Sequence, residues 1–218
     1  VDVENWWHIL DAAGVPEAGA WDGLESRLER GLSTLLELLA RHEIQATLFW
    51  LGWTAERHPE LLRRCVEAGH EIASQGYAHV LAYRVGRAAF REDLRRARGV
   101  LEDLGAGPVR GFRAAGFSVT AETPWAFDEI RAAGHEYDAS VFPAGRGHGG
   151  MRTAPLTPYT VPTDAGALVE LPNSVVRLCG RRVSLFGGGY LRLAPLWLIR
   201  RGVRRLQRAG RPVIVYVH

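Results

Sequence analysis

Apolar residues along the chain follow two different spacings. Between residues 24 and 39, leucines recur every three or four positions, which is the spacing of one face of an α-helix. The next apolar run, residues 46–51, is short, continuous and rich in residues that favour strands, and Gly52 follows it. The sequence therefore predicts an amphipathic helix followed by a buried strand.

This unit of helix and strand repeats along the chain. Further helices are expected at residues 59–68, 87–104, 123–133 and 193–209, strands at 71–73, 111–113, 137–139, 168–171 and 213–217, and a loop at 143–165. Such alternation predicts an α/β fold with a parallel sheet, either closed as a barrel or open. A length of 218 residues suits a single domain that spans residues 1–218.

Polar residues follow several of the predicted strands. In a barrel and in an open parallel sheet alike, ligands bind at the carboxyl ends of the strands. Asp2 and Glu4 are two residues apart in an extended segment, so their carboxylates share one face. Arg113 and His218 end later strands, and His79 lies in a turn after another. We expect these five side chains to meet at one edge of the sheet.

Each of these residues also has an ordinary structural explanation. Two nearby carboxylates can mark a solvated strand end, although they equally suit a metal ligand beside a general base. A lone histidine is more often structural, and an arginine after a strand can simply pair with a carboxylate. The position that they share, rather than any single residue, favours a catalytic site.

Composition and charge narrow the class of protein. The formal net charge is only +3, and all 27 basic residues are arginines, so charge gives no indication of nucleic-acid binding. The arginine-rich stretches 91–98 and 200–211 are expected to be solvent-facing sides of helices. No run of about 18 apolar residues occurs, so no membrane span is predicted.

The cysteines and the start of the chain give weaker indications of where the protein is located and of whether the sequence is complete. Cys65 and Cys179 fit neither a disulfide framework nor a metal-binding pair, so we expect free thiols in the core and a reducing, cytoplasmic location. The chain opens at Val1, already inside an apolar and acidic pattern and with no methionine. We therefore expect further residues to precede it in the natural protein.

Six motifs in the chain resemble those of one known family. Residues 1–6 read VDVENW, 69–79 GHEIASQGYAH, 111–114 GFRA, 137–143 YDASVFP, 187–190 GGGY and 215–218 VYVH. In this order they resemble the polysaccharide deacetylases, which share the NodB homology domain, and especially the branch associated with bacterial exopolysaccharide gene clusters. The resemblance runs through the whole chain.

The resemblance implies a distorted, incomplete (β/α) barrel of about seven units. It also implies a hydrolase that removes an N-acetyl or other N-acyl group from an amino sugar or its polymer, with a divalent metal, usually zinc, as cofactor. Asp2 matches the general base, His218 the general acid and Arg113 the residue that orients the base. An N-acylated sugar or polysaccharide would be the partner.

The metal-binding motif departs from the family in two places. Glu4 and His79 match two of the metal ligands, but Gln75 stands where the family has a histidine, and Asn5 stands where the opening motif has an aspartate. An amide oxygen is a poor zinc ligand beside an imidazole. We therefore expect Gln75 to weaken metal binding, and His8 is the one nearby residue that could replace the missing ligand.

Three explanations of these departures stay open. The chain could be a natural member with weak metal binding or different chemistry, a carbohydrate-binding relative without turnover, or a variant with engineered substitutions. We favour a hydrolytic site, because the base, the acid, the arginine and one histidine are retained. The candidate sugar-binding residues are Trp6, Trp7, Tyr77 and Tyr190, for which core packing is an equally ordinary role.

Overall fold

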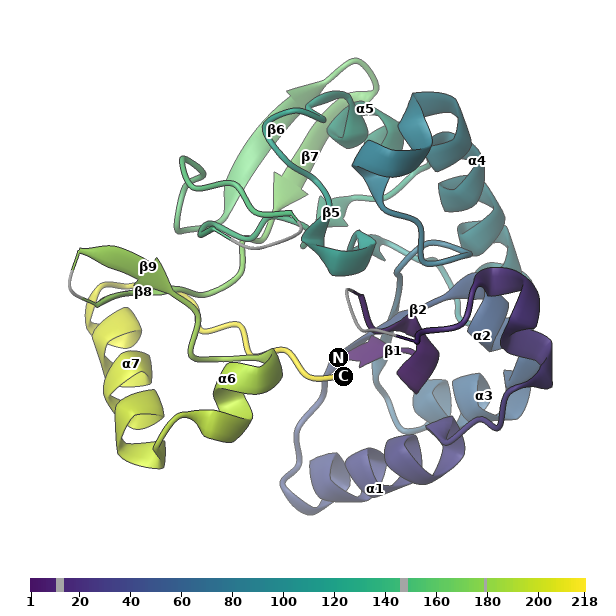
Figure 1. Cartoon of the computed structure of the whole chain (residues 1–218), viewed down its shortest axis with the longest axis horizontal. Coiled ribbons are helices and arrows are strands. Elements are labelled where there is room, and N and C mark those ends of the chain that lie inside the picture. The colour runs from purple at the N-terminus through teal and green to yellow at the C-terminus, as the bar shows by residue number, and fades with distance from the viewer. Residues whose placement is uncertain (11–13, 146–148, 179) are drawn as a thin grey trace.

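A seven-stranded sheet, in the order β1-β2-β3-β4-β5-β7-β6, organises the chain (Figure 1). The computed structural model describes residues 1–10, 14–145, 149–178 and 180–218. All neighbouring pairs are parallel except β6 and β7, which are antiparallel. The strands are β1 (Asp2–Val3), β2 (Thr47–Trp50), β3 (Glu71–Ser74), β4 (Gly111–Phe112), β5 (Tyr137–Asp138), β6 (Tyr159–Thr163) and β7 (Gly166–Glu170). The predicted α/β fold with a parallel sheet is confirmed.

Helices connect the parallel strands and lie around the outside of the sheet, as Figure 1 shows for α1 to α5. The helices are α1 (Leu28–Arg41), α2 (Gly52–Arg57), α3 (Pro59–Glu67), α4 (Ala82–Asp103), α5 (Trp125–Ala132), α6 (Gly188–Leu193) and α7 (Leu196–Arg208). Short 3-10 helices occupy Trp6–His8, Ala18–Gly23 and Ala115–Phe117. The apolar stripes of the helices cover the strands, and the resulting core includes Leu48, Trp50, Leu62 and Leu101.

The last residues of the chain extend the sheet beyond β1. The backbone N–H of Asp2 donates to the carbonyl of Val217 at 2.9 Å, and the N–H of Tyr216 donates to the carbonyl of Phe186 at 3.0 Å. The strands thus curve into a distorted, incomplete barrel whose gap is partly filled by this terminal segment. Residues 213–217 nevertheless form one isolated bridge, at Gly187, in place of the strand that we expected. The reason is that the partner segment turns into α6 directly after Gly187.

One further sequence expectation was wrong, and some short elements were not predicted. The predicted loop at 143–165 contains β6, which Pro162 concealed because proline cannot donate to an internal ladder. β6 is the edge strand of the sheet, where a missing N–H is tolerated. The apolar spacing also did not reveal α2, α6 and the hairpin of β8 (Val176–Leu178) and β9 (Arg181–Val183), because each of these elements is only six residues long or shorter.

The remaining expectations concern the cysteines and the membrane. Cys65 is a buried free thiol, as predicted, and Cys179 lies outside the described residues. Within the described ranges, no helix is long and apolar enough to cross a membrane.

A buried carboxylate joins α4 to α5. Glu129 is fully buried and pairs with Arg87 and Arg91, whose side chains are half-exposed, and Arg91 Nη2 donates to Glu129 Oε1 at 2.7 Å. The pKa of Glu129 is lowered to about 2, mainly by the hydrogen bond from Arg91 and further by the hydrogen bond from Arg87. The ionised carboxylate therefore stabilises the packing of these two helices.

Glu129→Gln is expected to reduce the free energy of unfolding at neutral pH by about 1.5–3 kcal/mol, the usual loss for a hydrogen bond to a charged group. Because the pKa of the folded protein lies below that of the unfolded chain, this stabilisation is complete above pH ~4.5 and is lost as the pH falls towards about 2. Urea denaturation at several pH values measures the difference between wild type and variant. A difference that stays constant across this range would contradict the assignment, and Glu122→Gln, at an exposed position, is the control.

A second carboxylate holds the turn after β3. Asp93 in α4 accepts hydrogen bonds from the backbone N–H groups of Tyr77 at 2.8 Å and Ala78 at 2.9 Å. Gly76 has a φ of +86°, and a Cβ there would lie 2.4 Å from Asp93 Oδ2. His79 itself has a φ of +54°, a strained value for a residue with a side chain. Asp93 thus fixes the backbone that presents His79.

Asp93→Asn places an amide NH₂ against one of these two N–H donors, so we expect a loss of about 1.5–3 kcal/mol in stability. The amide hydrogens of Tyr77 and Ala78 should also exchange faster than in the wild type. Thermal unfolding and hydrogen exchange measure the two effects. Asp103→Asn, at the exposed end of α4, is the matched control, and equal losses in both variants would show that the turn does not depend on Asp93.

Candidate active site

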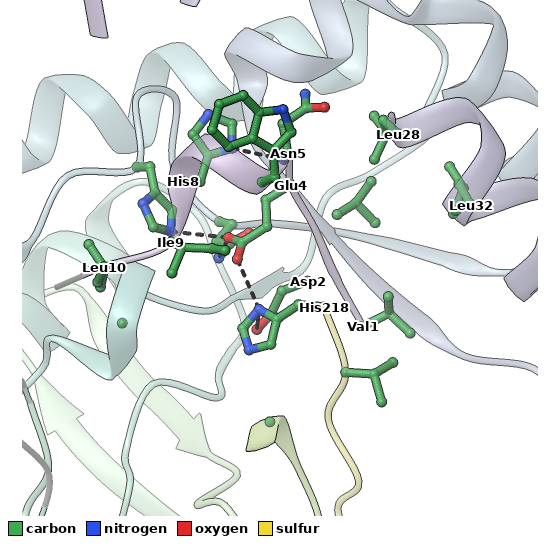
Figure 2. Close-up of a pocket in the computed structure, with 18 of the residues that line it drawn as sticks. Val1, Asp2, Glu4, Asn5, His8, Ile9, Leu10, Leu28, Leu32 and His218 are labelled. Carbon is green, nitrogen blue, oxygen red and sulfur yellow. Dashed lines mark hydrogen bonds and ion pairs between the residues drawn. The ribbon is translucent and has the colours of Figure 1, made fainter. Parts of the chain in front are cut away.

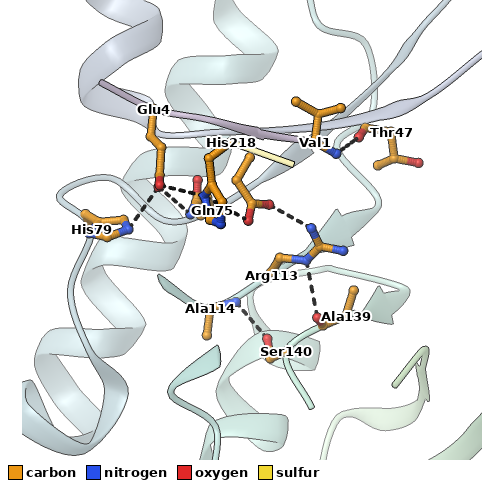
Figure 3. A network of polar contacts seen from close by, with 11 residues as sticks. Val1, Glu4, Thr47, Gln75, His79, Arg113, Ala114, Ala139, Ser140 and His218 are labelled. Carbon is orange, nitrogen blue, oxygen red and sulfur yellow. Dashed lines mark hydrogen bonds and ion pairs between the residues drawn. The ribbon is translucent and has the colours of Figure 1, made fainter. Parts of the chain in front are cut away.

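Polar side chains from several parts of the chain meet at the carboxyl ends of the parallel strands (Figure 3). Asp2 lies in β1, Gln75 and His79 follow β3, and Arg113 directly follows β4. His218 comes from the terminal segment beside β1. The structure therefore brings together the residues that the sequence places after separate strands.

Glu4, two residues after the start of β1, is the centre of this network. Its Oε1 lies 2.9 Å from Nδ1 of His218, and its Oε2 lies 3.1 Å from Nε2 of His79. Gln75 Nε2 donates to the same Oε2 at 2.9 Å. The buried carboxylate of Glu4 thus faces three nitrogen atoms.

Asp2 and Arg113 form a buried ion pair beside this centre. Arg113 Nη1 donates to Asp2 Oδ1 at 2.7 Å, and Arg113 Nε donates to the carbonyl of Ala139 at 3.3 Å. The guanidinium carbon also lies 4.1 Å from the centre of the Phe49 ring. Held on these sides, Arg113 fixes Asp2 so that Oδ2 lies 3.7 Å from Nδ1 of His218.

The charges of the site shift two pKa values in opposite directions. Burial raises the pKa of Glu4, but the hydrogen bonds from His218 and His79 outweigh it and hold the pKa well below its usual range. Burial lowers the pKa of His218, whereas its hydrogen bond to Glu4 and the charge of Asp2 raise it, and the net pKa lies above the usual value. The site therefore favours an ionised carboxylate beside a protonated imidazole, which is the form that donates a proton.

His8 does not replace the missing metal ligand. Its ring centre lies 5.4 Å from that of His79, so distance alone would allow it to approach a metal. The backbone N–H of Asn5, however, donates to His8 Nδ1 at 3.0 Å. Burial lowers the pKa of His8 to about 3, so the ring is neutral and its one proton is on Nε2. A protonated Nε2 has no lone pair for a metal.

Glu4 and His79 have the chemistry to hold a divalent cation. A carboxylate oxygen and an imidazole nitrogen that face the same point fit zinc. Gln75 adds only an amide, whose nitrogen faces Glu4, while its buried Oε1 has no hydrogen-bond partner among the residues that the structure describes. In the part of the chain that the structure describes, no group of three or more His, Cys, Asp or Glu residues could hold a metal ion. The donors therefore provide two strong ligands, whereas catalytic zinc usually has three from the protein.

A pocket of about 740 Å³ surrounds this network (Figure 2). One wall carries the polar groups, and the other is apolar and formed by one side of α1. The polar wall includes Asp2, Glu4, Gln75, His79 and His218, and the apolar wall includes Leu28, Leu32 and Leu35. The backbone of Gly188 and Gly189 borders the same space. A ligand in the pocket can thus contact charged groups and apolar surface at once.

The four aromatic candidates for sugar binding differ in position. Trp6 is exposed and lines the pocket, and Tyr190 is exposed close to the glycines at its border. Trp7 and Tyr77 are instead buried in a core cluster with Trp53. The expectation of sugar contact does not hold for these two, because their rings face other core side chains and not the pocket.

The contacts of Tyr77 explain its burial. Its hydroxyl donates to Glu56 Oε2 at 2.7 Å and accepts from Arg96 Nη2 at 2.6 Å, and the Arg96 guanidinium carbon lies 3.4 Å from the ring centre. Tyr77 therefore links α2 to α4 under the turn that carries His79. Asn5 is also tied down, since its Oδ1 accepts a hydrogen bond from Ser26 at 2.8 Å.

Three buried polar residues that the sequence did not reveal, Asp138, Ser140 and Glu170, lie beside the strand end that carries Arg113. Ser140 Oγ accepts from the N–H of Ala114 at 2.7 Å and donates to Asp138. Asp138 and Glu170 are directly paired in β5 and β7, and burial raises the pKa of both carboxyls. The signal that could have revealed them is an acidic residue at the end of each of two neighbouring, otherwise uncharged strands.

Comparison with known proteins shows which family the chain resembles. Residues 22–137 match the family described as polysaccharide deacetylase, and residues 139–218 match a domain of unknown function, DUF3473. The chain is 30% identical over 70 residues to a peptidoglycan-N-acetylglucosamine deacetylase of Bacillus cereus, which covers 32% of this chain and 26% of that protein. It is 42% identical over 45 residues to a chitooligosaccharide deacetylase of Sinorhizobium fredii, which covers 21% of each.

These matches span about a quarter or less of the length of the two curated relatives. A crystal structure described as a polysaccharide deacetylase from Mycobacterium smegmatis is similar over 100% of this chain and 74% of that one, with a TM-score of 0.69 and 25% sequence identity. The family match covers more than half of the chain. The chain therefore belongs to the polysaccharide deacetylase family.

Proposed function

We propose that this chain hydrolyses the N-acyl group of an amino sugar. The observation that carries this proposal is that Asp2, the Glu4–His79 pair and His218 line one pocket, while the buried Arg113 pairs with Asp2. A base, a cation-binding pair and a proton donor are the groups that metal-assisted amide hydrolysis uses. Two similar proteins, one named a peptidoglycan-N-acetylglucosamine deacetylase and the other a chitooligosaccharide deacetylase, support an N-acetylated sugar as the substrate.

We further propose that Glu4 and His79 hold a divalent cation, with zinc as the first candidate. A bound cation of this kind polarises the acyl carbonyl and lowers the pKa of water towards ~7. Gln75 can contribute only a neutral amide oxygen, and only after its amide has rotated, because its nitrogen now donates to Glu4. The affinity for the cation should therefore be weaker than in a site with a second histidine.

The protein groups supply the proton transfers. Asp2 is the base that accepts a proton from the attacking water, and Arg113 orients its carboxylate. His218 is the acid that donates a proton to the departing sugar nitrogen, consistent with its raised pKa and its half-exposed side chain. Trp6 at the edge of the pocket is the aromatic surface available to a sugar ring.

His218→Gln is expected to lower the turnover number by about 10²–10⁴-fold, because an amide cannot act as a general acid. The assay measures acetate released from N-acetylated chitooligosaccharides, with zinc added. His42→Gln, at the exposed end of α1, should keep wild-type activity. Oligosaccharide binding without any acetate release by the wild type would favour a binding protein over an enzyme.

Gln75→His is expected to tighten metal binding, since it would provide two histidines and one carboxylate. Changing the partners of metal ligands typically alters affinity by about 10–100-fold, so exchange of a ligand position should produce at least that gain. Elemental analysis after dialysis, on both forms, measures it. One tightly held zinc in the unaltered chain would show that Gln75 does not weaken the site.

A further inference from the structure

Charge is distributed very unevenly along the chain. Residues 171–218 contain ten arginines and neither aspartate nor glutamate, which gives this segment a formal charge of +10. Residues 1–170 contain 17 arginines and 24 acidic residues, for a formal charge of −7. The modest total of +3 therefore conceals a strongly basic terminal segment attached to an acidic body.

The structure gathers this segment into one lobe beside the barrel. Figure 1 shows β8, β9, α6 and α7 together on one side of the molecule, with α7 on the outer side. One side of α7 packs inward, where Gly202 and Leu206 are buried against Phe186. The arginines face outward and exposed, at positions 192, 200, 201, 204, 205 and 208.

Large apolar side chains are exposed in the same lobe. Leu193 is 86% exposed and Trp197 is 67% exposed, and the exposed Tyr190 and Leu196 lie within the same eight-residue stretch. Single exposed apolar residues are common, but a group of this size marks a surface that binds something. On α7, Trp197, Arg201, Arg204 and Arg208 recur at helical spacing, so the aromatic ring and the charges share one face.

We propose that this face, α6 and the outer side of α7, binds the surface of a membrane that contains anionic phospholipids. Arginines beside exposed leucine and tryptophan side chains are the features of helices that lie in the interface between headgroups and acyl chains. Anionic headgroups attract the arginines, and the apolar side chains enter the acyl boundary. This occupant accounts for both features, whereas a soluble polyanion would leave the leucines and Trp197 exposed to water.

Docking by this face would place the pocket close to the membrane. Gly188, Gly189 and Arg192 belong to α6 and also line the pocket of the candidate active site. The same helix therefore borders both surfaces. A bound membrane would bring the pocket entrance near any sugar that is presented there, but the binding itself does not depend on the proposed hydrolysis.

Flotation with phospholipid vesicles tests the proposal on the full chain. We expect the protein to bind vesicles of phosphatidylglycerol and phosphatidylcholine at 50 mM NaCl, and not vesicles of phosphatidylcholine alone. Arg201→Gln combined with Arg204→Gln should weaken binding by about 25-fold, since each arginine near an anionic surface contributes roughly a five-fold factor. Arg84→Gln combined with Arg95→Gln removes the same charge from exposed positions of α4 and should have no comparable effect.

The apolar contribution is tested separately. Leu193→Gln combined with Trp197→Gln should weaken binding at least about 10-fold, whereas Tyr83→Gln combined with Val169→Gln, at exposed apolar positions away from the lobe, should not. Equal binding of both vesicle types, or equal losses in test and control variants, would overturn the proposal. It would also fail if dextran sulfate bound as tightly as the vesicles and the apolar variants bound normally, or if the chain only self-associated at low salt in sedimentation velocity.

Discussion

The buried ion pair between Asp2 and Arg113 holds the strand ends in the positions that the site requires. β1 and β4 are not neighbours in the sheet, because β2 and β3 lie between them, so the pair crosses the mouth of the barrel. The net stabilisation by such a pair is small, but removal of one partner leaves an unpaired buried charge that costs about 3–5 kcal/mol. The Asp2–Arg113 pair therefore restricts the positions of β1 and β4 even though it adds little net stability.

Asp2 couples this pair to the end of the chain. Its side chain meets Arg113 while its backbone N–H donates to Val217, the residue before His218. A shift of β1 would thus move Asp2 and His218 together. The two-residue strand would be too short to fix a site by its ladder alone, and these contacts compensate for that.

Much of the scaffold could be predicted from the chain, because short apolar runs such as β2 and β3 and the leucine stripe of α1 follow simple spacings. The positions of the polar site residues followed from the rule that parallel strands end at one edge. What spacing could not give was packing. Tyr77 is buried because Glu56 and Arg96 hold its hydroxyl, and neither partner is evident from the sequence around it.

The contacts that hold the site residues in place also depend on packing and not on spacing along the chain. Asp93 reaches the turn before His79 from a helix in the middle of the chain, so no local pattern reveals the contact. His8 shows the reverse case. Its distance to His79 suits a ligand, and only the hydrogen bond from the backbone of Asn5 shows that the wrong nitrogen carries the proton.

Gln75 adds a hydrogen bond to Glu4 with which a cation would have to compete. With an imidazole at this position, Glu4 and His79 could both offer lone pairs to a metal. The amide nitrogen of Gln75 instead donates a hydrogen bond to Glu4. His218 and His79 can donate to the same carboxylate. The carboxylate therefore has nitrogen partners without any cation, and a cation must displace some of them to bind. Hydrogen bonds that hold Glu4 and His79 in place thus preserve the shape of the site, and under the proposed metal binding they would reduce the affinity for a cation.

The basic terminal segment connects this site to the outer surface of the molecule. It supplies His218 to the pocket, Val217 to the edge of β1 and the arginines to the outer side of α7. Because Val217 is hydrogen-bonded to β1 and Tyr216 to Phe186, the lobe is joined to the barrel at the same place where His218 enters the site. A surface that docks through this lobe would therefore face the pocket in one fixed orientation, and the uneven charge would orient the acidic body away from an anionic surface before contact is made.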